Sequence, residues 1–471
     1  MAATRGRRRG EPARRRGNEG STDAVDPVEL TAPASRAELR GRRVVATAAS
    51  RPLRAIARHG RLHRRPWATF GKVVASVAVV AVVSVLGIGG VAAANLVSDV
   101  KPSVHLVGEE KLGPIPDIGA LDGGVNILLA ASDTRTGQGD AWGTIDDSSG
   151  AGLNDVTMLV HLSQDHTHAV VVSFPRDLIL KIPQCPDGKG GWNSAMSAQP
   201  LNTTLSDGGV ACTVLTIEQL TGLQIPFAGV VDFEGVVAMS NAVGGVPVCI
   251  TGGGIHDEHT SLDLPDGTSV LQGMQAAEFL RTRYGVGDGS DLGRISNTQV
   301  FLSSLVRTVM TKTTLSNPVK VWGLVKAAQQ HIQWSDSLKN VTTLYQIAMA
   351  AKDLKYQNIV FVQYPVGSDS NDPGKVVADH ESADTLMQAI KNDQPVQLTG
   401  GTGVGAVNST DASGSGAASS GGDGSGDSSS TGASGGTPTA SGSAAPSTPV
   451  ALPEDVKGQT AATQTCSKGN N

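Results

Sequence analysis

Apolar and polar positions follow two different spacings along the middle of the chain. Short segments rich in β-branched residues predict strands at 124–132, 156–162, 168–174, 227–233 and 246–250. Segments with apolar residues three to four positions apart predict helices at 213–222, 234–245, 271–283 and 295–310. Strands and helices mixed in this way indicate an α/β fold, in which a sheet lies between layers of helices.

Two further regions follow this predicted domain, which we place at 123–310. The region 311–397 is expected to pack on the domain as an appendage. Its expected elements are three helices and a strand, at 318–330, 338–353, 382–392 and 358–366. From residue 398 the chain is dominated by Gly, Ser, Thr and Ala, which bury too little apolar surface to fold. We therefore predict a disordered tail over 398–471, in which the last twenty residues have no recognisable role.

The segment 73–97 contains no charged residue over 25 positions, which is long enough for a transmembrane helix. It begins too late in the chain for a cleaved signal peptide. The preceding segment 1–72 has 18 Arg and Lys against six Asp and Glu, which predicts a disordered cytoplasmic tail by the positive-inside rule. The stalk 98–122 and everything after it are then extracytoplasmic. A basic tail could also bind nucleic acid, but membrane topology already explains its charge, so no nucleic acid is expected.

All four cysteines, Cys185, Cys212, Cys249 and Cys466, follow the predicted anchor. None of them forms a CxxC pair, which makes a zinc site a weak reading. An even number of cysteines outside the cytosol predicts disulfides. Cys185 with Cys212 is the natural local pair, although three connectivities are open.

Arginines gather in the sequence FLRTRYGVGDGSDLGRISNTQ, residues 279–299. Arg281 and Arg283 point to the same face if their segment is extended, and a glycine-rich turn can bring Arg294 back toward them. Arg176 follows the strand 168–174. Guanidinium groups bind phosphate oxygens in pairs, so the four arginines predict a diphosphate site. In the alternative interpretation they are surface residues paired with the neighbouring Asp177, Asp288 and Asp291.

Two carboxylates border the first predicted strands. Asp133 follows the strand 124–132, and Asp155 precedes the strand 156–162. Neighbouring strands would bring both to one sheet edge, where Mg²⁺ (or Mn²⁺) is held by one or two carboxylates together with ligand phosphates. The alternative is that each is a cap or turn residue.

Other candidate motifs are weaker. The glycine-rich stretch 285–293 lacks the Lys-Ser/Thr of a P-loop and the terminal Glu of an EF-hand. His161, His166 and His168 cluster on a predicted hairpin, where we expect solvated turn and strand residues and no metal ligands.

Six segments taken together resemble the LytR-CpsA-Psr (LCP) family of Gram-positive cell envelopes, and they arrive in the family's order. They are NILLAASDTR (126–135), NDVTMLVHL (154–162), VVVSFPRD (170–177), TIEQLTGL (216–223), VVDFEGVVAMSNAVGGVPVCI (230–250) and LRTRYGVGDGSDLGRI (280–295). The resemblance covers roughly residues 123–310. The basic tail, single anchor and Ser/Gly-rich end are similar to those of actinobacterial members.

The resemblance implies an α-β-α sandwich with a mixed central sheet and an apolar channel for a polyprenyl chain. It implies transfer of a glycopolymer from a polyprenyl-pyrophosphate carrier to peptidoglycan, through a phosphodiester link, by a protein anchored in the cell membrane. Asp133 and Asp155 would hold Mg²⁺. The pyrophosphate would lie against Arg176, Arg281, Arg283 and Arg294, and either Asp155 or Asp177 would take the proton of the attacking hydroxyl.

The sequence departs from the family pattern at two places. Pro200 stands where the family usually has a lysine, although Asn202 is retained. The glutamine usual four residues after the last arginine is replaced by Thr298, and Gln299 stands next to it as the expected amide donor. Because this lysine is missing, a non-catalytic protein that binds the lipid carrier or the cell wall is the second alternative. The third alternative is a membrane-bound transcriptional attenuator.

Overall fold

The computed structural model describes residues 101–112, 121, 123–134, 152–339, 341–412 and 448–470. The predicted cytoplasmic tail and the predicted membrane span 73–97 lie outside these ranges. Of the helices within them, none is long and apolar enough to cross a bilayer.

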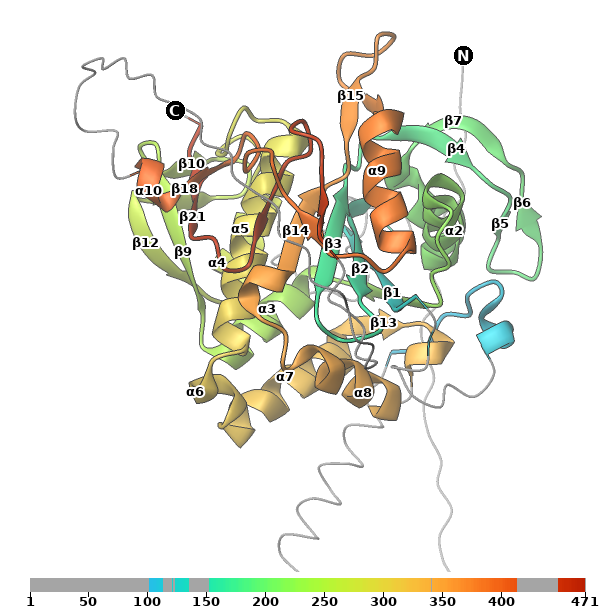
Figure 1. Cartoon of the computed structure of the whole chain (residues 1–471), viewed down its shortest axis with the longest axis horizontal. Helices are drawn as coiled ribbons and strands as arrows, with labels where there is room; N and C mark the ends of the chain where they lie inside the picture. The colour runs from blue at the N-terminus through green and yellow to red at the C-terminus, as the bar shows by residue number, and fades with distance from the viewer. Residues whose placement is uncertain are drawn as a thin grey trace, which may run out of the picture. The chain divides into compact units, whose positions relative to one another are not determined.

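A central sheet of seven strands organises the fold (Figure 1). In spatial order the strands are β13 (Ile332–Trp334), β8 (Phe227–Val231), β1 (Val125–Ser132), β2 (Asn154–Leu162), β3 (Ala169–Phe174), β14 (Ile359–Gln363) and β20 (Gly458–Thr460). The pairs β1–β8 and β3–β14 are parallel, and the other neighbours are antiparallel. The sheet is therefore mixed, as predicted.

Helices cover both faces of this sheet. The helices are α2 (Thr204–Thr221), α3 (Phe233–Val243), α4 (Met274–Arg281), α5 (Asp291–Val309), α6 (Lys312–Leu315), α7 (Pro318–His331), α8 (Val341–Ala351), α9 (His380–Lys391) and α10 (Ser409–Ala412). Alternate strand residues point to opposite faces, so Leu159 and Val172 pack with α2 and α9, while Val171 and Phe361 pack with α5 and α8. Figure 1 shows α2 and α9 on one side of the sheet and α5 on the other. The predicted sandwich is confirmed.

A second sheet packs on the outer side of α5. It contains β12 (Gly267–Leu271), β9 (Val246–Thr251), β21 (Thr465–Lys468) and β18 (Ala406–Asn408). The remaining strands form short pairs: β4 (Ile179–Ile182) with β7 (Met196–Pro200), β5 (Cys185–Pro186) with β6 (Trp192–Asn193), β10 (Ile255–Asp257) with β11 (Leu262–Leu264), β15 (Val366–Ser368) with β16 (Val376–Ala378), and β17 (Val396–Gln397) with β19 (Val450–Ala451).

The region 311–397 is not an appendage. Its strands β13 and β14 lie in the central sheet, where β13 pairs with β8 and β14 pairs with β3. The sequence shows that these segments are strands, but not which distant strand each of them pairs with.

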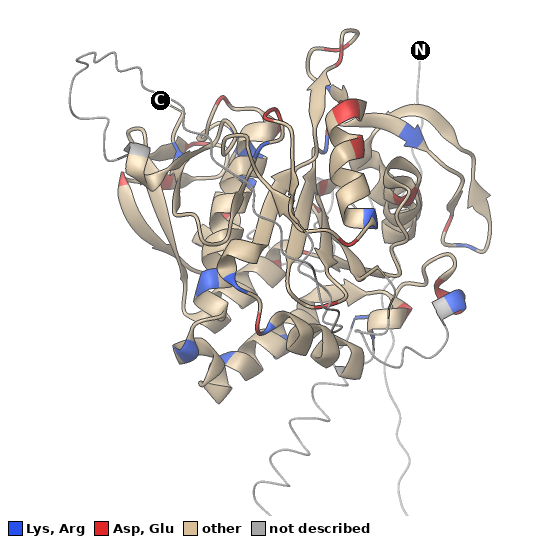
Figure 2. Cartoon of the chain, viewed as in Figure 1, with Lys and Arg blue, Asp and Glu red and all other residues tan. Residues whose placement is uncertain are grey.

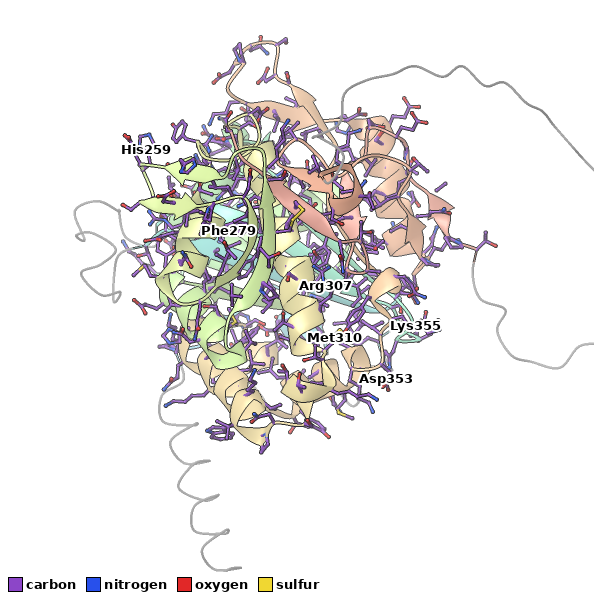
Figure 3. All side chains as sticks on the ribbon, turned by 90° about the vertical axis from the view of Figure 1, so that its left-hand side faces the viewer. His259, Phe279, Arg307, Met310, Asp353 and Lys355 are labelled. Carbon is purple, nitrogen blue, oxygen red and sulfur yellow. A yellow bond between two sulfur atoms is a disulfide. The ribbon has the colours of Figure 1, made fainter. Side chains whose placement is uncertain are left out.

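The prediction of disorder over 398–471 is wrong for residues 398–412 and 448–470. These residues contribute β18, β19, β20 and β21, and they bury Leu452, Val456 and Ala461 in the cores. Arg307 of α5, labelled in Figure 3, donates from Nη1 to the carbonyl oxygen of Ala461 at 2.7 Å. A few apolar anchors and this half-buried cation therefore hold a segment whose composition predicts disorder.

Both disulfides involve residues near this framework. Cys185 pairs with Cys212, as the local prediction has it, and Cys249 pairs with Cys466. The second bond joins β9 to β21 in the second sheet, which gives a structural role to the last twenty residues.

The predicted solvation of the hairpin histidines is wrong for two of them. His161 is fully buried and His168 is 4% exposed, because both side chains lie on the face of the sheet that is covered by α2 and α9. His166 occupies the turn with a φ of 58°.

Candidate active site

The start of β2 and the ends of β1 and β3 meet at one edge of the central sheet. The pairing of β1 with β2 and of β2 with β3 is antiparallel, so Asp133, Asp155 and Arg176 come to the same edge. The Asp133 carboxylate accepts a hydrogen bond from the backbone N–H of Leu153 at 2.5 Å. The two predicted carboxylates are therefore neighbours in the fold, at the end of the sheet that also holds an arginine.

Arg176 is surrounded by carboxylates. Its Nη1 donates to Asp155 Oδ1 at 2.7 Å, and its backbone N–H donates to Asp291 Oδ2 at 2.9 Å. Burial lowers the pKa of Arg176, but Asp155, Asp291 and Asp177 together outweigh burial and raise it. The guanidinium group is thus a fixed positive charge at the sheet edge, and within the described residues its Nε has no hydrogen-bond partner.

Arg294 is fixed in the first turn of α5, which begins after the N-cap residue Ser290. Its Nε and Nη2 donate to Asp291 Oδ1 at 3.0 and 2.6 Å, and Nη2 also donates to the backbone carbonyl oxygen of Asp155 at 2.5 Å. Since Asp291 bonds to both Arg176 and Arg294, it holds the strand end and the helix start in one network. Arg294 is only 5% exposed, so its charge acts in a poorly solvated place.

Arg281 and Arg283 flank the end of α4. Arg281 is the last helical residue, and its guanidinium carbon lies 4.7 Å from the centre of the Phe233 ring. Thr282 has extended backbone angles, whereas Arg281 is helical, so the predicted extended segment does not include Arg281. Arg283 is half-buried, and its Nε has no hydrogen-bond partner in the described ranges. The charge of Arg283 adds to those of Lys375 and Arg176, which lower the pKa of Asp177.

Lys375 is a cation of this site that the sequence did not reveal. Its Nζ lies 2.6 Å from Asp177 Oδ1, and it reaches the site from the hairpin of β15 and β16. Burial raises the pKa of Asp177, but Lys375 and Arg176 outweigh burial and lower it. No motif marks a lysine 198 residues away from its partner. Pro200, where the family lysine is missing, belongs to β7.

The glycine-rich turn between Arg283 and Arg294 is held by the end of the chain. Gly287 has a φ of 61°, and its N–H donates to the carbonyl oxygen of Lys468 at 2.9 Å. The N–H of Asn470 donates to the carbonyl oxygen of Gly285 at 3.0 Å. A Cβ atom added at Gly287 would lie 3.0 Å from the Cα atom of Gly405. These glycines therefore serve close backbone packing.

An apolar cavity of about 180 Å³ opens beside the arginines. Its apolar wall includes Leu129, Met158, Phe233, Val236, Leu280 and Leu302. Asp155, Asp232, Arg281 and Arg294 also line it, so part of the wall is charged and most of the rest is hydrocarbon. Thr298 borders the cavity, whereas the predicted amide donor Gln299 does not. Both polar atoms of Gln299 are buried without a partner among the described residues.

Comparison with known proteins identifies the family. Residues 99–392, more than half of the chain, match the LytR_cpsA_psr family. The chain belongs to the LytR-CpsA-Psr family. Because the match extends to residue 392, the family domain does not end at 310, in agreement with the places of β13 and β14 in the central sheet.

Several LCP relatives can be compared directly. The chain is 28% identical over 279 residues to the cell wall biosynthesis protein LcpA of Corynebacterium glutamicum, covering 54% of this chain and 52% of that protein. It is 31% identical over 175 residues to the polyisoprenyl-teichoic acid–peptidoglycan teichoic acid transferase TagU of Oceanobacillus iheyensis, covering 36% and 47%. The LytR-Csp2A-Psr enzyme from Actinomyces oris superposes with a TM-score of 0.45 at 18% identity, covering 62% and 96%. The chain thus spans about half the length of these two curated relatives.

The donor set of the LCP site suits a hard divalent ion. Asp133 and Asp155 offer carboxylate oxygens at one edge, and Arg176 occupies only Oδ1 of Asp155. Two carboxylates and the oxygens of a phosphate are typical ligands of Mg²⁺. The residues therefore fit the ion that the family resemblance implies.

Proposed function

We propose that the protein transfers a glycopolymer from a polyprenyl-pyrophosphate carrier to peptidoglycan and joins them by a phosphodiester. The observation that carries the proposal is the position of Arg281 and Arg294 in the wall of an apolar cavity. A lipid pyrophosphate needs hydrocarbon and guanidinium surfaces side by side, and this cavity offers both. The similarity to TagU, a polyisoprenyl-teichoic acid–peptidoglycan teichoic acid transferase, supports the same reaction class.

The arginines of the site act by position and charge. The lipid chain lies in the cavity, and its pyrophosphate lies against Arg281, Arg283 and Arg294, with Arg176 behind them. A hydroxyl of peptidoglycan attacks the sugar-bearing phosphorus, the bond from that phosphorus to the bridging oxygen breaks, and polyprenyl phosphate leaves. Negative charge on the phosphate oxygens is stabilised by guanidinium groups that are already oriented.

The proton of the attacking hydroxyl passes to a carboxylate of the site. Asp155 and Asp177 are the two candidates. Burial raises the pKa of Asp177, but Lys375 and Arg176 outweigh burial and lower it, which makes Asp177 a weaker base than an ordinary aspartate. Asp133 and Asp155 would also hold Mg²⁺ or Mn²⁺, which would neutralise pyrophosphate charge when bound.

A cavity of about 180 Å³ is smaller than the roughly 300–1,000 Å³ of typical ligand pockets. A long prenyl chain therefore requires α3 and α5 to move apart.

Filling the cavity with a larger side chain tests the proposal that the lipid chain binds there. We expect Val236→Trp to lower the transfer rate by at least roughly 50-fold, because excluding about three CH₂ groups costs ~2.4 kcal/mol. The measurement is transfer of polymer from a polyprenyl-pyrophosphate donor to peptidoglycan by purified protein with Mg²⁺. Val270→Trp is the control, since Val270 is 58% exposed on β12. Wild-type protein that binds the donor without transferring it would instead be a carrier protein.

We also propose that the domain works at a membrane surface. On α6 and α7 the apolar side chains Leu315, Val319 and Trp322 are 51%, 78% and 42% exposed. These helices carry Lys312, Lys320 and Lys326 and no acidic residue, as Figure 2 shows. An exposed apolar face with lysines is typical of helices that lie on anionic bilayers.

Vesicle binding by a fragment of residues 101–471 tests whether the exposed apolar face of α6 and α7 binds a membrane. We expect Val319→Glu to weaken co-sedimentation with anionic phospholipid vesicles roughly tenfold, since burying a valine contributes about 1.5 kcal/mol. Val270→Glu should leave binding unchanged. Equal binding by all three proteins, or none by the wild type, would refute membrane docking through α7.

A further inference from the structure

A second cluster of chemically active side chains lies at the other end of β2 and β3. His161 Nε2 and Asp393 Oδ1 are 3.1 Å apart. Each of His161, His168 and Asp393 offers one donor atom, and the three atoms lie within 4.8 Å of one another. Six residues separate Asp155 from His161 along β2, which puts this cluster about 20 Å from the arginine site.

The orientation of His161 is fixed by a neighbouring amide. Asn126 Nδ2 donates to the carbonyl oxygen of Gln224 at 2.9 Å, so the Asn126 Oδ1 atom is the one that faces His161 Nδ1, also at 2.9 Å. His161 Nδ1 therefore carries a proton. Its Nε2 points at a carboxylate oxygen, and a positive species must lie between these two atoms, either a proton or a metal ion.

His168 supplies an independent observation. It is 4% exposed, and its buried Nε2 has no hydrogen-bond partner in the described part of the chain. A polar atom buried in this way costs about 1–3 kcal/mol unless it binds something. A neutral imidazole has the lone pair that a metal ion requires.

Asp393 is held where a carboxylate is otherwise unfavourable. It follows the C-terminal end of α9 with a φ of 52°, and the negative end of a helix dipole repels an anion. The N–H of Gln164 donates to both carboxylate oxygens, at 3.3 and 3.1 Å. These bonds connect the end of α9 to the β2–β3 turn and aim the carboxylate at the two histidines.

We propose that His161, His168 and Asp393 bind one divalent transition-metal ion such as Zn²⁺, at a site separate from the arginines. Two imidazoles and one carboxylate are a common ligand set for Zn²⁺, with water as the fourth ligand. The Nδ1–H of His161 donates to an amide oxygen, as metal-bound histidines generally do to an outer partner. Asp393 is 20% exposed, which gives the ion and a water a path to the site. The ion ties α9 to the central sheet.

Cobalt titration of the tag-free full chain in detergent, after metal depletion by a chelator, tests the site. We expect one equivalent of Co²⁺ to bind with visible absorption bands, excess Mg²⁺ to leave it bound, and Zn²⁺ to displace it. His168→Gln should weaken Co²⁺ binding at least roughly 100-fold, with circular dichroism to verify folding. His256→Gln is the control, because His256 is exposed and faces Asp263 on a separate hairpin.

Two outcomes would overturn the proposal. If the wild-type protein binds no Co²⁺, the positive species between His161 and Asp393 is a proton, and the cluster is a buried imidazolium–carboxylate pair. Equal binding by wild type and His168→Gln would place the metal elsewhere in the chain. His168→Gln is suited to this decision, since within the described ranges His168 Nε2 makes no hydrogen bond that the substitution would remove. Neither result depends on the transfer reaction.

Discussion

The double variant Arg281→Ala/Arg283→Ala is expected to lose transfer activity by at least about 1,000-fold. Removing a single oriented donor to a transition-state oxyanion commonly costs about 100- to 1,000-fold, and this variant removes two guanidinium groups, that of Arg281 in the cavity wall and that of Arg283 two residues on. The measurement is the transfer rate with donor at saturating concentration, together with donor binding by the same protein. A loss in rate larger than the loss in binding would show that the arginines act mainly in the transition state.

The fold should survive this substitution. Arg283 makes no side-chain hydrogen bond from Nε in the described residues, and the contact of Arg281 with Phe233 is worth only about 0.5–1 kcal/mol. Arg307→Ala is the control for loss of an arginine that supports the fold and lies outside the site, because Arg307 donates hydrogen bonds to the carbonyl oxygens of Ala461 and Thr463. It should lower the melting temperature and leave the transfer rate of folded protein unchanged. Near-normal activity in the double variant would defeat the assignment of the arginines.

Local sequence pattern predicts the elements of this fold well because the strands and helices are short and strongly patterned. It also predicts that Asp133 and Asp155 share one sheet edge, since neighbouring strands bring these two ends together. The structure adds Arg176 to them through the pairing of β2 with β3. The local disulfide Cys185–Cys212 follows from proximity in sequence for the same reason.

The contacts that the sequence missed join residues far apart along the chain. Lys375 meets Asp177 across 198 residues, and Asp393 meets His161 across 232. The end of the chain supports the arginine turn through backbone hydrogen bonds at Gly285 and Gly287, which carry no side-chain signature. Composition alone does not identify the few apolar residues after the Gly/Ser-rich segment, Leu452, Val456 and Ala461, that join an existing core.

Asp155→Asn is the second substitution for which we expect a large effect. The change keeps the size of the side chain and removes the charge that Arg176 Nη1 meets at 2.7 Å. It also removes one of the two carboxylates proposed to hold Mg²⁺ and one of the two candidate proton acceptors. Loss of a general base alone costs about 100- to 10,000-fold, so we expect the transfer rate to fall at least about 100-fold and its response to Mg²⁺ concentration to weaken.

Asp288→Asn is the matched control, since Asp288 is an exposed carboxylate of the arginine turn that accepts a hydrogen bond from the N–H of Ser290. An asparagine oxygen can accept the same bond, so activity and Mg²⁺ response should stay at the wild-type level. The two variants together separate the general effect of removing a negative charge near the arginines from the particular role of Asp155. If Asp155→Asn matched Asp288→Asn in rate and in Mg²⁺ response, the sheet edge would hold Arg176 in place without taking part in the chemistry.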